Sequence, residues 1–268
     1  MEYRILGKTG LKISRMGFGG IPIQRIDAEG TKALMHKLLE NGVNYIDTAR
    51  GYTVSEEYLG IGLEGIREHF VLATKSMSRT AEAMAKDIDI SLKNLRTDYI
   101  DLYQIHNAPP ADVEKVCSPG GALEALTAAK KAGKIGHIGI TAHSLETFRM
   151  ALELPWVETI MFPYNIVEDQ AKELIHACAE KNIGFIAMKP LAGGAIEDAV
   201  TALRYVCANP DVTVVIPGMA DIAELNQNLA AVNDSSPLSV EEEAKMRAIR
   251  DALGTQFCRR CNYCQPCS

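Results

Sequence analysis

Three short apolar runs in the first 106 residues each end in a titratable side chain: Asn44-Tyr45-Ile46-Asp47, Val71-Leu72-Ala73-Thr74-Lys75 and Ile100-Asp101-Leu102-Tyr103-Gln104-Ile105-His106. A fourth titratable residue, Tyr52, follows Asp47 by five positions. If the runs are parallel strands, all four groups point out of one end of one sheet, the end that carries the active site of an α/β barrel. An ammonium can lower the pKa of a phenol, and a carboxylate can hold and polarise that ammonium. We therefore expect Asp47, Tyr52, Lys75 and His106 to form a catalytic group.

Short β-like runs alternate with amphipathic stretches along most of the chain. The expected strands lie near Met16–Phe18, Tyr45–Asp47, Val71–Lys75, Ile100–His106, His137–Thr141, Thr159–Pro163, Gly184–Lys189 and Val214–Pro217. The expected helices cover Thr31–Asn41, Thr80–Leu95, Ala122–Ala132, Leu145–Leu154, Asp169–Lys181, Ile196–Ala208 and Ile222–Val232. Because strand–helix–strand connections are right-handed, eight strands in this alternation predict an α/β fold, a (β/α)8 TIM barrel.

Three segments lie outside the repeat. Residues 1–13 read as a β-hairpin with a turn at 7–10, and Val240–Leu253 reads as one extra helix. Residues 254–268 form a cysteine-rich tail. No Pro/Ser/Gly-rich linker divides the chain, so we expect one barrel domain, 1–253, followed by the tail, and we expect the loop 107–121 to leave its strand extended.

Composition excludes several classes of partner. The 268 residues are 47% hydrophobic and carry a net charge of −6, which argues against a nucleic-acid or anionic-membrane surface. No apolar run approaches the roughly 18 residues that span a membrane, and Met1-Glu2-Tyr3-Arg4 is not a signal peptide. We expect a cytoplasmic protein.

The motifs of the chain, in their order and spacing, resemble those of the aldo-keto reductases from residue 1 to about residue 232. The resemblance rests on Gly7-Lys8-Thr9-Gly10-Leu11, Gly17-Phe18-Gly19-Gly20, Asp47-Thr48-Ala49 with Tyr52, Lys75, Asp98-Tyr99-Ile100-Asp101-Leu102 with His106, Gly139-Ile140, Tyr164-Asn165, Pro190-Leu191 with Gly194, and Ile216-Pro217-Gly218. It implies reduction of an aldehyde or ketone by NAD(P)H. Tyr52 would then donate the proton, Lys75 and Asp47 would tune it, and His106 would orient the carbonyl.

The resemblance also implies where the nicotinamide cofactor binds. The implied contacts are Gly19, Gly20, Asp47, Thr141, Met161, Met188, Pro190, Leu191, Gly193, Gly194, Pro217, Gly218, Met219, Glu224, Gln227 and Asn228. Three positions depart from the family pattern. Thr141-Ala142 replace a Ser-Asn pair, Met161 replaces a glutamine, and Met188 stands near the position of a stacking aromatic.

Glu224 bears on the choice between NAD and NADP. Members that prefer NADP carry Lys-Ser and a later arginine where this chain has Gly218, Met219 and Glu224. A glutamate repels a 2′-phosphate, whereas it can accept a hydrogen bond from a 2′-hydroxyl. We hypothesise that the protein does not strongly prefer NADP and uses NAD; the alternative is that Glu224 is only a solvated helix-face residue.

The tail holds four cysteines at equal spacing, Cys258, Cys261, Cys264 and Cys267. In a cytosolic acidic protein this spacing favours a metal site over disulfides, and cysteines at two-residue gaps are typical of [4Fe–4S] ligation. A subgroup of aldo-keto reductases resembles this chain in having such an extension. Zinc and unligated thiols stay open as alternatives.

Two functional readings follow from the whole sequence. The first is a reductase of a small-molecule carbonyl substrate. The second is a nicotinamide-binding regulatory or electron-transfer protein, in which an iron–sulfur cluster would serve a redox partner protein. The tetrad of Asp47, Tyr52, Lys75 and His106 favours the enzyme.

Overall fold

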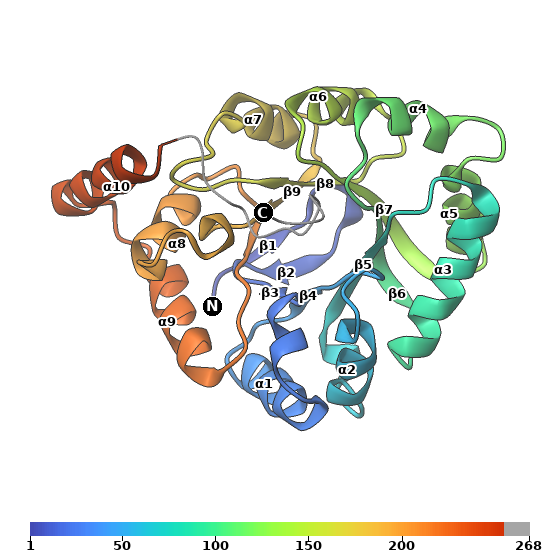
Figure 1. The fold of residues 1–268 in the computed structure, drawn as a ribbon, viewed down its shortest axis with the longest axis horizontal. Coiled ribbons are helices and arrows are strands. Elements are labelled where there is room, and N and C mark those ends of the chain that lie inside the picture. The colour runs from blue at the N-terminus through green and yellow to red at the C-terminus, as the bar shows by residue number, and fades with distance from the viewer. Residues whose placement is uncertain (255–268) are drawn as a thin grey trace, which may run out of the picture.

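The computed structural model describes residues 1–254, in which eight parallel strands form a barrel surrounded by helices (Figure 1). The strands are β3 (Phe18–Gly19), β4 (Tyr45–Asp47), β5 (Val71–Ser76), β6 (Ile100–Ile105), β7 (Ile135–Thr141), β8 (Thr159–Pro163), β9 (Gly184–Met188) and β10 (Val214–Ile216). They pair in sequence order. The two edges meet where Gly17 N donates to Val215 O at 2.8 Å and Gly19 N donates to Pro217 O at 3.0 Å. The predicted (β/α)8 fold is confirmed.

One helix follows each strand, and two more lie outside the repeat. The repeat helices are α1 (Ala28–Glu40), α2 (Ser55–Gly62), α3 (Ala81–Asn94), α5 (Ala122–Lys131), α6 (Leu145–Glu153), α7 (Lys172–Glu180), α8 (Ala199–Cys207) and α9 (Ile222–Asn233). The additional helices are α4 (Pro110–Cys117) and α10 (Val240–Leu253). Four short 3₁₀ turns also occur, η1 (Gly7–Thr9), η2 (Pro22–Arg25), η3 (Arg67–His69) and η4 (Ala192–Gly194). None of the helices within residues 1–254 is long and apolar enough to cross a membrane.

Two helices depart from the expectations. The loop 107–121 does not stay extended, because Pro110 stands in the first turn of α4, where its missing N–H costs nothing, and Val113 and Val116 are buried. Helix α2 was not predicted, because its eight residues are too few to show a period and include Gly60. A Cβ atom at Gly60 would lie 2.2 Å from the Asn94 carbonyl oxygen, so this glycine lets α2 pack directly on the end of α3.

The predicted N-terminal hairpin is confirmed as β1 (Tyr3–Ile5) paired antiparallel with β2 (Lys12–Ser14). Leu6 and Ile13 of the hairpin are fully buried and belong to the same apolar cluster as residues inside the barrel, such as Leu102. Lys8 N donates to Asn182 O at 2.7 Å, just before β9 begins. The hairpin therefore closes the amino-terminal end of the barrel and leaves the carboxyl end for a site.

Helix α10 is held against the barrel by two arginines. The guanidinium of Arg204 in α8 donates to Glu242 of α10 at 2.8 Å, and Arg250 of α10 donates to the Ile166 carbonyl at 2.9 Å. Ser239 caps α10 through a reciprocal capping box with Glu242.

Glu158 ties three elements together at the amino end of β7 and β8. Its carboxylate accepts from Lys130 of α5 at 2.6 Å and from the Ile138 N–H at 3.0 Å, and it lies 2.7 Å from Nδ1 of His137. Burial alone would raise the pKa of Glu158, but the hydrogen bonds from His137, Lys130 and Ile138 outweigh it and lower the pKa to about 2. A carboxyl group with a depressed pKa stabilises the fold above its unfolded pKa.

Glu158→Gln should lower the free energy of unfolding by about 1 kcal/mol at pH 7, because charge-assisted hydrogen bonds are lost from a site that is partly open to solvent. The wild-type carboxylate contributes less to the free energy of unfolding as the pH drops from 4.5, the ordinary pKa of a glutamate, towards its pKa of about 2 in the folded protein. Urea unfolding of both proteins at pH 7 and at lower pH measures this. The difference between them should shrink in acid, and a constant difference would contradict the assignment.

Candidate active site

A buried ion pair joins two of the predicted catalytic residues at the carboxyl end of the barrel. Asp47 is the last residue of β4 and Lys75 is the penultimate residue of β5, and each side chain is 2% exposed. Lys75 Nζ donates to Oδ1 of Asp47 at 2.8 Å, also to Oδ2, and to the Thr48 carbonyl oxygen at 2.8 Å. The ammonium is thus fixed in place by three acceptors on one strand end.

Tyr52 and His106 lie against this pair. Tyr52 is half-buried in the loop between β4 and α2, and its ring centroid is 4.8 Å from Lys75 Nζ. His106 directly follows β6, is 4% exposed, and meets the Tyr52 ring edge-on at 5.9 Å between centroids. The structure therefore brings all four predicted catalytic residues together.

The pKa of Tyr52 moves in the direction opposite to the expected one. Burial raises the pKa well above its usual value, and the charge of Asp47 raises it further. The prediction of a lowered pKa is wrong, because burial and the Asp47 carboxylate, which both disfavour a phenolate, outweigh the attraction of the Lys75 ammonium for it. Tyr52 is consequently protonated at neutral pH, as a proton donor must be.

His106 is held in its neutral form. Burial lowers its pKa to about 2, and the electrostatic effects of Lys75, His143, Arg79 and Lys189 act in the same direction. Its position is set by the backbone, because His106 N donates to the Ser76 carbonyl at 2.9 Å. A neutral imidazole can donate a hydrogen bond to a carbonyl oxygen without giving up its proton.

Sequence reasoning missed several residues that hold these groups. Arg79, after β5, donates to the His106 carbonyl at 2.9 Å and to the Asn107 carbonyl at 3.0 Å. Arg50 and Glu56 form an ion pair of 2.8 Å on either side of Tyr52 in the sequence. These residues lie close in sequence to the predicted catalytic residues, and that closeness was the one sign that could have found them. Their hydrogen bonds and ion pairs join different loops, and the spacing of residues in a sequence does not show such contacts.

Three residues that we expected to contact the cofactor lie in the neighbouring strands β7, β8 and β9. Thr141 is the last residue of β7, and its hydroxyl accepts from the Asn107 N–H at 2.8 Å. Met161 of β8 is 1% exposed inside the barrel, and Met188, the last residue of β9, is half-buried and packs against the same apolar cluster. Met188 offers an apolar surface beside the catalytic end, whereas Met161 is enclosed.

At two further places where the resemblance implies cofactor binding, glycines leave the backbone without side chains. After β9, Pro190 and Leu191 lead into η4, where Gly193 and Gly194 have φ of 71° and 91°, a conformation that side chains disfavour. Beside the β3–β10 junction lie Gly19, Gly20, Pro217 and Gly218. A Cβ atom at Gly20 would lie 2.8 Å from the Asp47 carbonyl oxygen. Met219 is fully buried in the outer core, so only its backbone can face a ligand.

Glu224 has a defined position at the start of α9. Its carboxylate accepts from the Ala220 N–H at 2.6 Å, and its own N–H donates to the capping Asp221 at 2.8 Å. Two carboxylates therefore occupy the N-terminus of this helix, which otherwise attracts phosphate. Gln227 is exposed and Asn228 is buried one turn further along.

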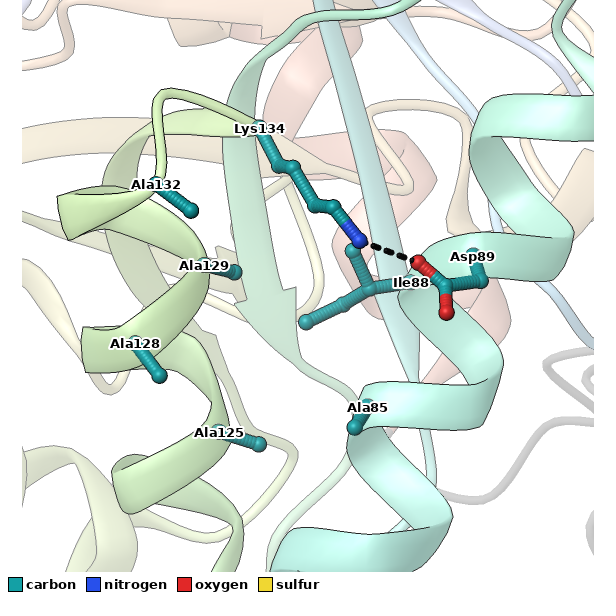
Figure 2. Close-up of a pocket in the computed structure, with 8 residues that line it drawn as sticks. All are labelled: Ala85, Ile88, Asp89, Ala125, Ala128, Ala129, Ala132 and Lys134. Atoms are coloured by element: carbon teal, nitrogen blue, oxygen red, sulfur yellow. Dashed lines mark hydrogen bonds and ion pairs between the residues drawn. The ribbon is translucent and has the colours of Figure 1, made fainter.

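One further pocket within residues 1–254 lies away from the predicted catalytic residues. A groove of about 220 Å³ lies between α3 and α5 on the outer helical layer (Figure 2), lined by alanines and closed by the Lys134–Asp89 ion pair at 2.7 Å. It contains none of the expected site residues. Within residues 1–254 no group of three or more His, Cys, Asp or Glu side chains could hold a metal. The four tail cysteines, Cys258, Cys261, Cys264 and Cys267, lie outside the described residues, so the cluster stays a prediction from sequence.

Comparison with known proteins agrees with the geometry. A family model described as the aldo/keto reductase family matches residues 15–201. L-galactose dehydrogenase of Arabidopsis thaliana is 28% identical over 91% of this chain and 92% of that protein. Aldo-keto reductase YhdN of Bacillus subtilis is 33% identical over 68% of this chain and 59% of its own length. The holo structure of aldo-keto reductase AKR11C1 from Bacillus halodurans matches with a TM-score of 0.81 at 26% identity, covering 93% of this chain and 96% of that one.

Proposed function

Because the chain belongs to the aldo/keto reductase family, we propose that it uses NAD(P)H to reduce the carbonyl group of a small aldehyde or ketone, with Tyr52 as the proton donor. One observation carries the proposal. The buried Asp47–Lys75 pair, the Tyr52 ring 4.8 Å from Lys75 Nζ, and the neutral His106 meet at the carboxyl end of the barrel. Because one similar protein is named L-galactose dehydrogenase, we include an aldose among the candidate substrates.

The roles of the four side chains follow from their electrostatics. Bound NAD(P)H supplies the hydride. Negative charge then develops on the carbonyl oxygen, and the site must place donors where that charge appears. The protonated Tyr52 hydroxyl gives up its proton, and the neutral His106 orients the oxygen by a hydrogen bond. Lys75 attracts the phenolate that forms, while Asp47 holds the ammonium against the phenol.

The residues present fit a nicotinamide dinucleotide. Gly193 in η4 and Gly218 at the β10–α9 junction leave backbone N–H groups uncovered by side chains, which suits a pyrophosphate. The N–H of Gly194 already donates to the Leu191 carbonyl oxygen at 2.8 Å. Gly218 is itself exposed. We assign this role to Gly193 and Gly218, and the nicotinamide contacts to Thr141 and Met188.

NADH should bind at least about tenfold more tightly than NADPH, because a 2′-phosphate would meet the carboxylates of Glu224 and Asp221, and about 1.4 kcal/mol of repulsion suffices for that ratio. Fluorescence titration with both nucleotides measures it. Glu224→Gln should tighten NADPH binding and leave NADH binding unchanged. Glu241→Gln, at an exposed glutamate of α10, is the control and should change neither.

Tighter binding of NADPH than of NADH by the wild-type protein would refute the NAD preference while leaving the reductase proposal intact. Dissociation constants above roughly 1 mM mean negligible specific affinity. If both nucleotides bind that weakly, the reductase proposal itself fails.

A further inference from the structure

Glu56 is a buried carboxylate to which the reaction described above gives no role. It is the second residue of α2, and it is 1% exposed. Its Oε1 accepts from the Thr74 hydroxyl at 2.8 Å and from the Ser91 hydroxyl at 2.7 Å. Its Oε2 accepts from Arg50 Nη1 at 2.8 Å and from Asn94 Nδ2 at 3.4 Å. Removing one partner of a buried, hydrogen-bonded charge such as this is strongly destabilising, because it leaves the charge uncompensated.

The partners of Glu56 belong to the elements that carry the catalytic residues. Arg50 and Glu56 flank Tyr52 in the sequence, so their ion pair closes the loop that presents the phenol. Arg50 N also donates to the Lys75 carbonyl oxygen at 3.0 Å. Thr74 is the residue directly before Lys75 in β5. A single carboxylate thus connects the loop of Tyr52 with the strand of Lys75.

A second acid, Asp87 of α3, extends the connection. It accepts from the Ser76 hydroxyl and, at 2.6 Å, from the Ser78 hydroxyl, and it lies 3.8 Å from Arg50 Nε. The carbonyl oxygen of Ser76 in turn accepts from His106 N at 2.9 Å. Glu56 and Asp87 therefore bind side chains on residues near Tyr52 and Lys75, and Ser76 links this group to the backbone of His106.

We propose that Glu56 is a positioning residue for the carbonyl reduction: acting through Arg50 and Thr74, it fixes the Tyr52 phenol relative to the Lys75 ammonium. The inference rests on the proposed reductase function. Proton donation depends on the placement of the donor, and a shift of about 1 Å can lower a rate by a factor on the order of 100. Nucleotide binding does not depend on this placement, because the residues assigned to the nucleotide lie on β7, β9 and the loops that follow β9 and β10.

Glu56→Gln tests the proposal with little change of volume. The amide oxygen can still accept from Thr74 and Ser91, but the amide nitrogen would face the guanidinium of Arg50, a donor against a donor. We expect kcat for an aldehyde to fall by about 10- to 100-fold, with KM and the NADH dissociation constant unchanged. Arg50→Met should give the same loss, and it keeps the test available if Glu56→Gln folds poorly.

Two controls separate positioning from a general loss of stability. Glu158→Gln removes a carboxylate of similar connectivity from the opposite end of the barrel and should leave kcat unchanged at temperatures below unfolding. The double variant Arg50→Met/Glu56→Gln removes the clash between donors, so it should regain thermal stability while kcat stays low.

Three results would overturn the inference: a wild-type kcat in Glu56→Gln, an equal loss of kcat in Glu158→Gln, or recovery of kcat in the double variant. Absence of turnover in the wild-type protein, with a range of aldehydes and both nucleotides, would instead count against the reductase function on which the inference rests.

Discussion

Tyr52→Phe should reduce kcat for carbonyl reduction by about 10²- to 10⁴-fold, the usual contribution of a positioned proton donor. The phenyl ring retains its edge contact with His106 and its contact with Lys75, so the fold and the affinity for NADH should be unchanged. Stopped-flow turnover and fluorescence titration, run side by side, separate the chemical step from nucleotide binding. Tyr99→Phe, at a tyrosine 38% exposed at the other end of β6, is the matched control.

The pH dependence of the wild-type enzyme adds to this test. Because burial raises the pKa of Tyr52, the phenol is protonated below that raised value, and the proton donor is lost only in strongly alkaline solution. The kcat for reduction should therefore be level through neutral pH. Wild-type turnover by Tyr52→Phe would exclude its assigned role as proton donor. Loss of turnover with full retention of the biological role would favour the alternative of a nicotinamide-binding regulatory protein.

Lys75→Met should destabilise the protein by about 3–5 kcal/mol at pH 7, the largest stability effect that we expect, because it leaves the Asp47 carboxylate buried without a counter-charge. Burial raises the pKa of Asp47 even though the positive charge of Lys75 lowers it. Without Lys75, the pKa of Asp47 should therefore be higher still. A carboxyl group whose folded pKa is raised takes up a proton on folding, so the variant should become more stable as pH falls below 7. Urea unfolding at pH 5 and pH 7 measures both effects.

A double variant distinguishes charge from chemistry at this pair. Asp47→Leu/Lys75→Met removes both charges, and it should regain most of the lost stability, since buried pairs are commonly replaceable by apolar side chains. Its reductase activity should stay low, because nothing then stabilises the Tyr52 phenolate. A double variant as unstable as Lys75→Met alone would contradict the view that an unpaired carboxylate causes the loss.

The sequence predicted those features that depend on local periodicity and on chain order. Strands Tyr45–Asp47 and Thr159–Pro163 and the helix Val240–Leu253 appear with the expected bounds, because apolar alternation, glycine and a capping serine mark their ends. Helix α4 was missed because a pair of prolines was read as a loop, although a proline also suits a first helical turn.

The catalytic residues that could be predicted are those at or next to the carboxyl ends of the strands. Parallel strands place their carboxyl ends together whatever the loops do, so Asp47, Lys75 and His106 could be grouped from spacing. The direction of the Tyr52 pKa could not be predicted, because it depends on burial and on how completely Asp47 neutralises Lys75. The contacts of Glu56 with Thr74 and Ser91 were equally hidden, since they join side chains far apart in sequence.

The closure of the barrel also shapes how the chain folds. Gly19 lies in the first barrel strand and pairs beside Gly218, after the last one, so this contact spans most of the chain. Contacts between residues so distant in sequence slow folding, since the entropy of closing a long loop is lost before the contact forms. During synthesis the edge of β3 stays unpaired until β10 has emerged from the ribosome. An exposed strand edge can pair with other chains, so this interval is when the nascent protein is most prone to aggregate.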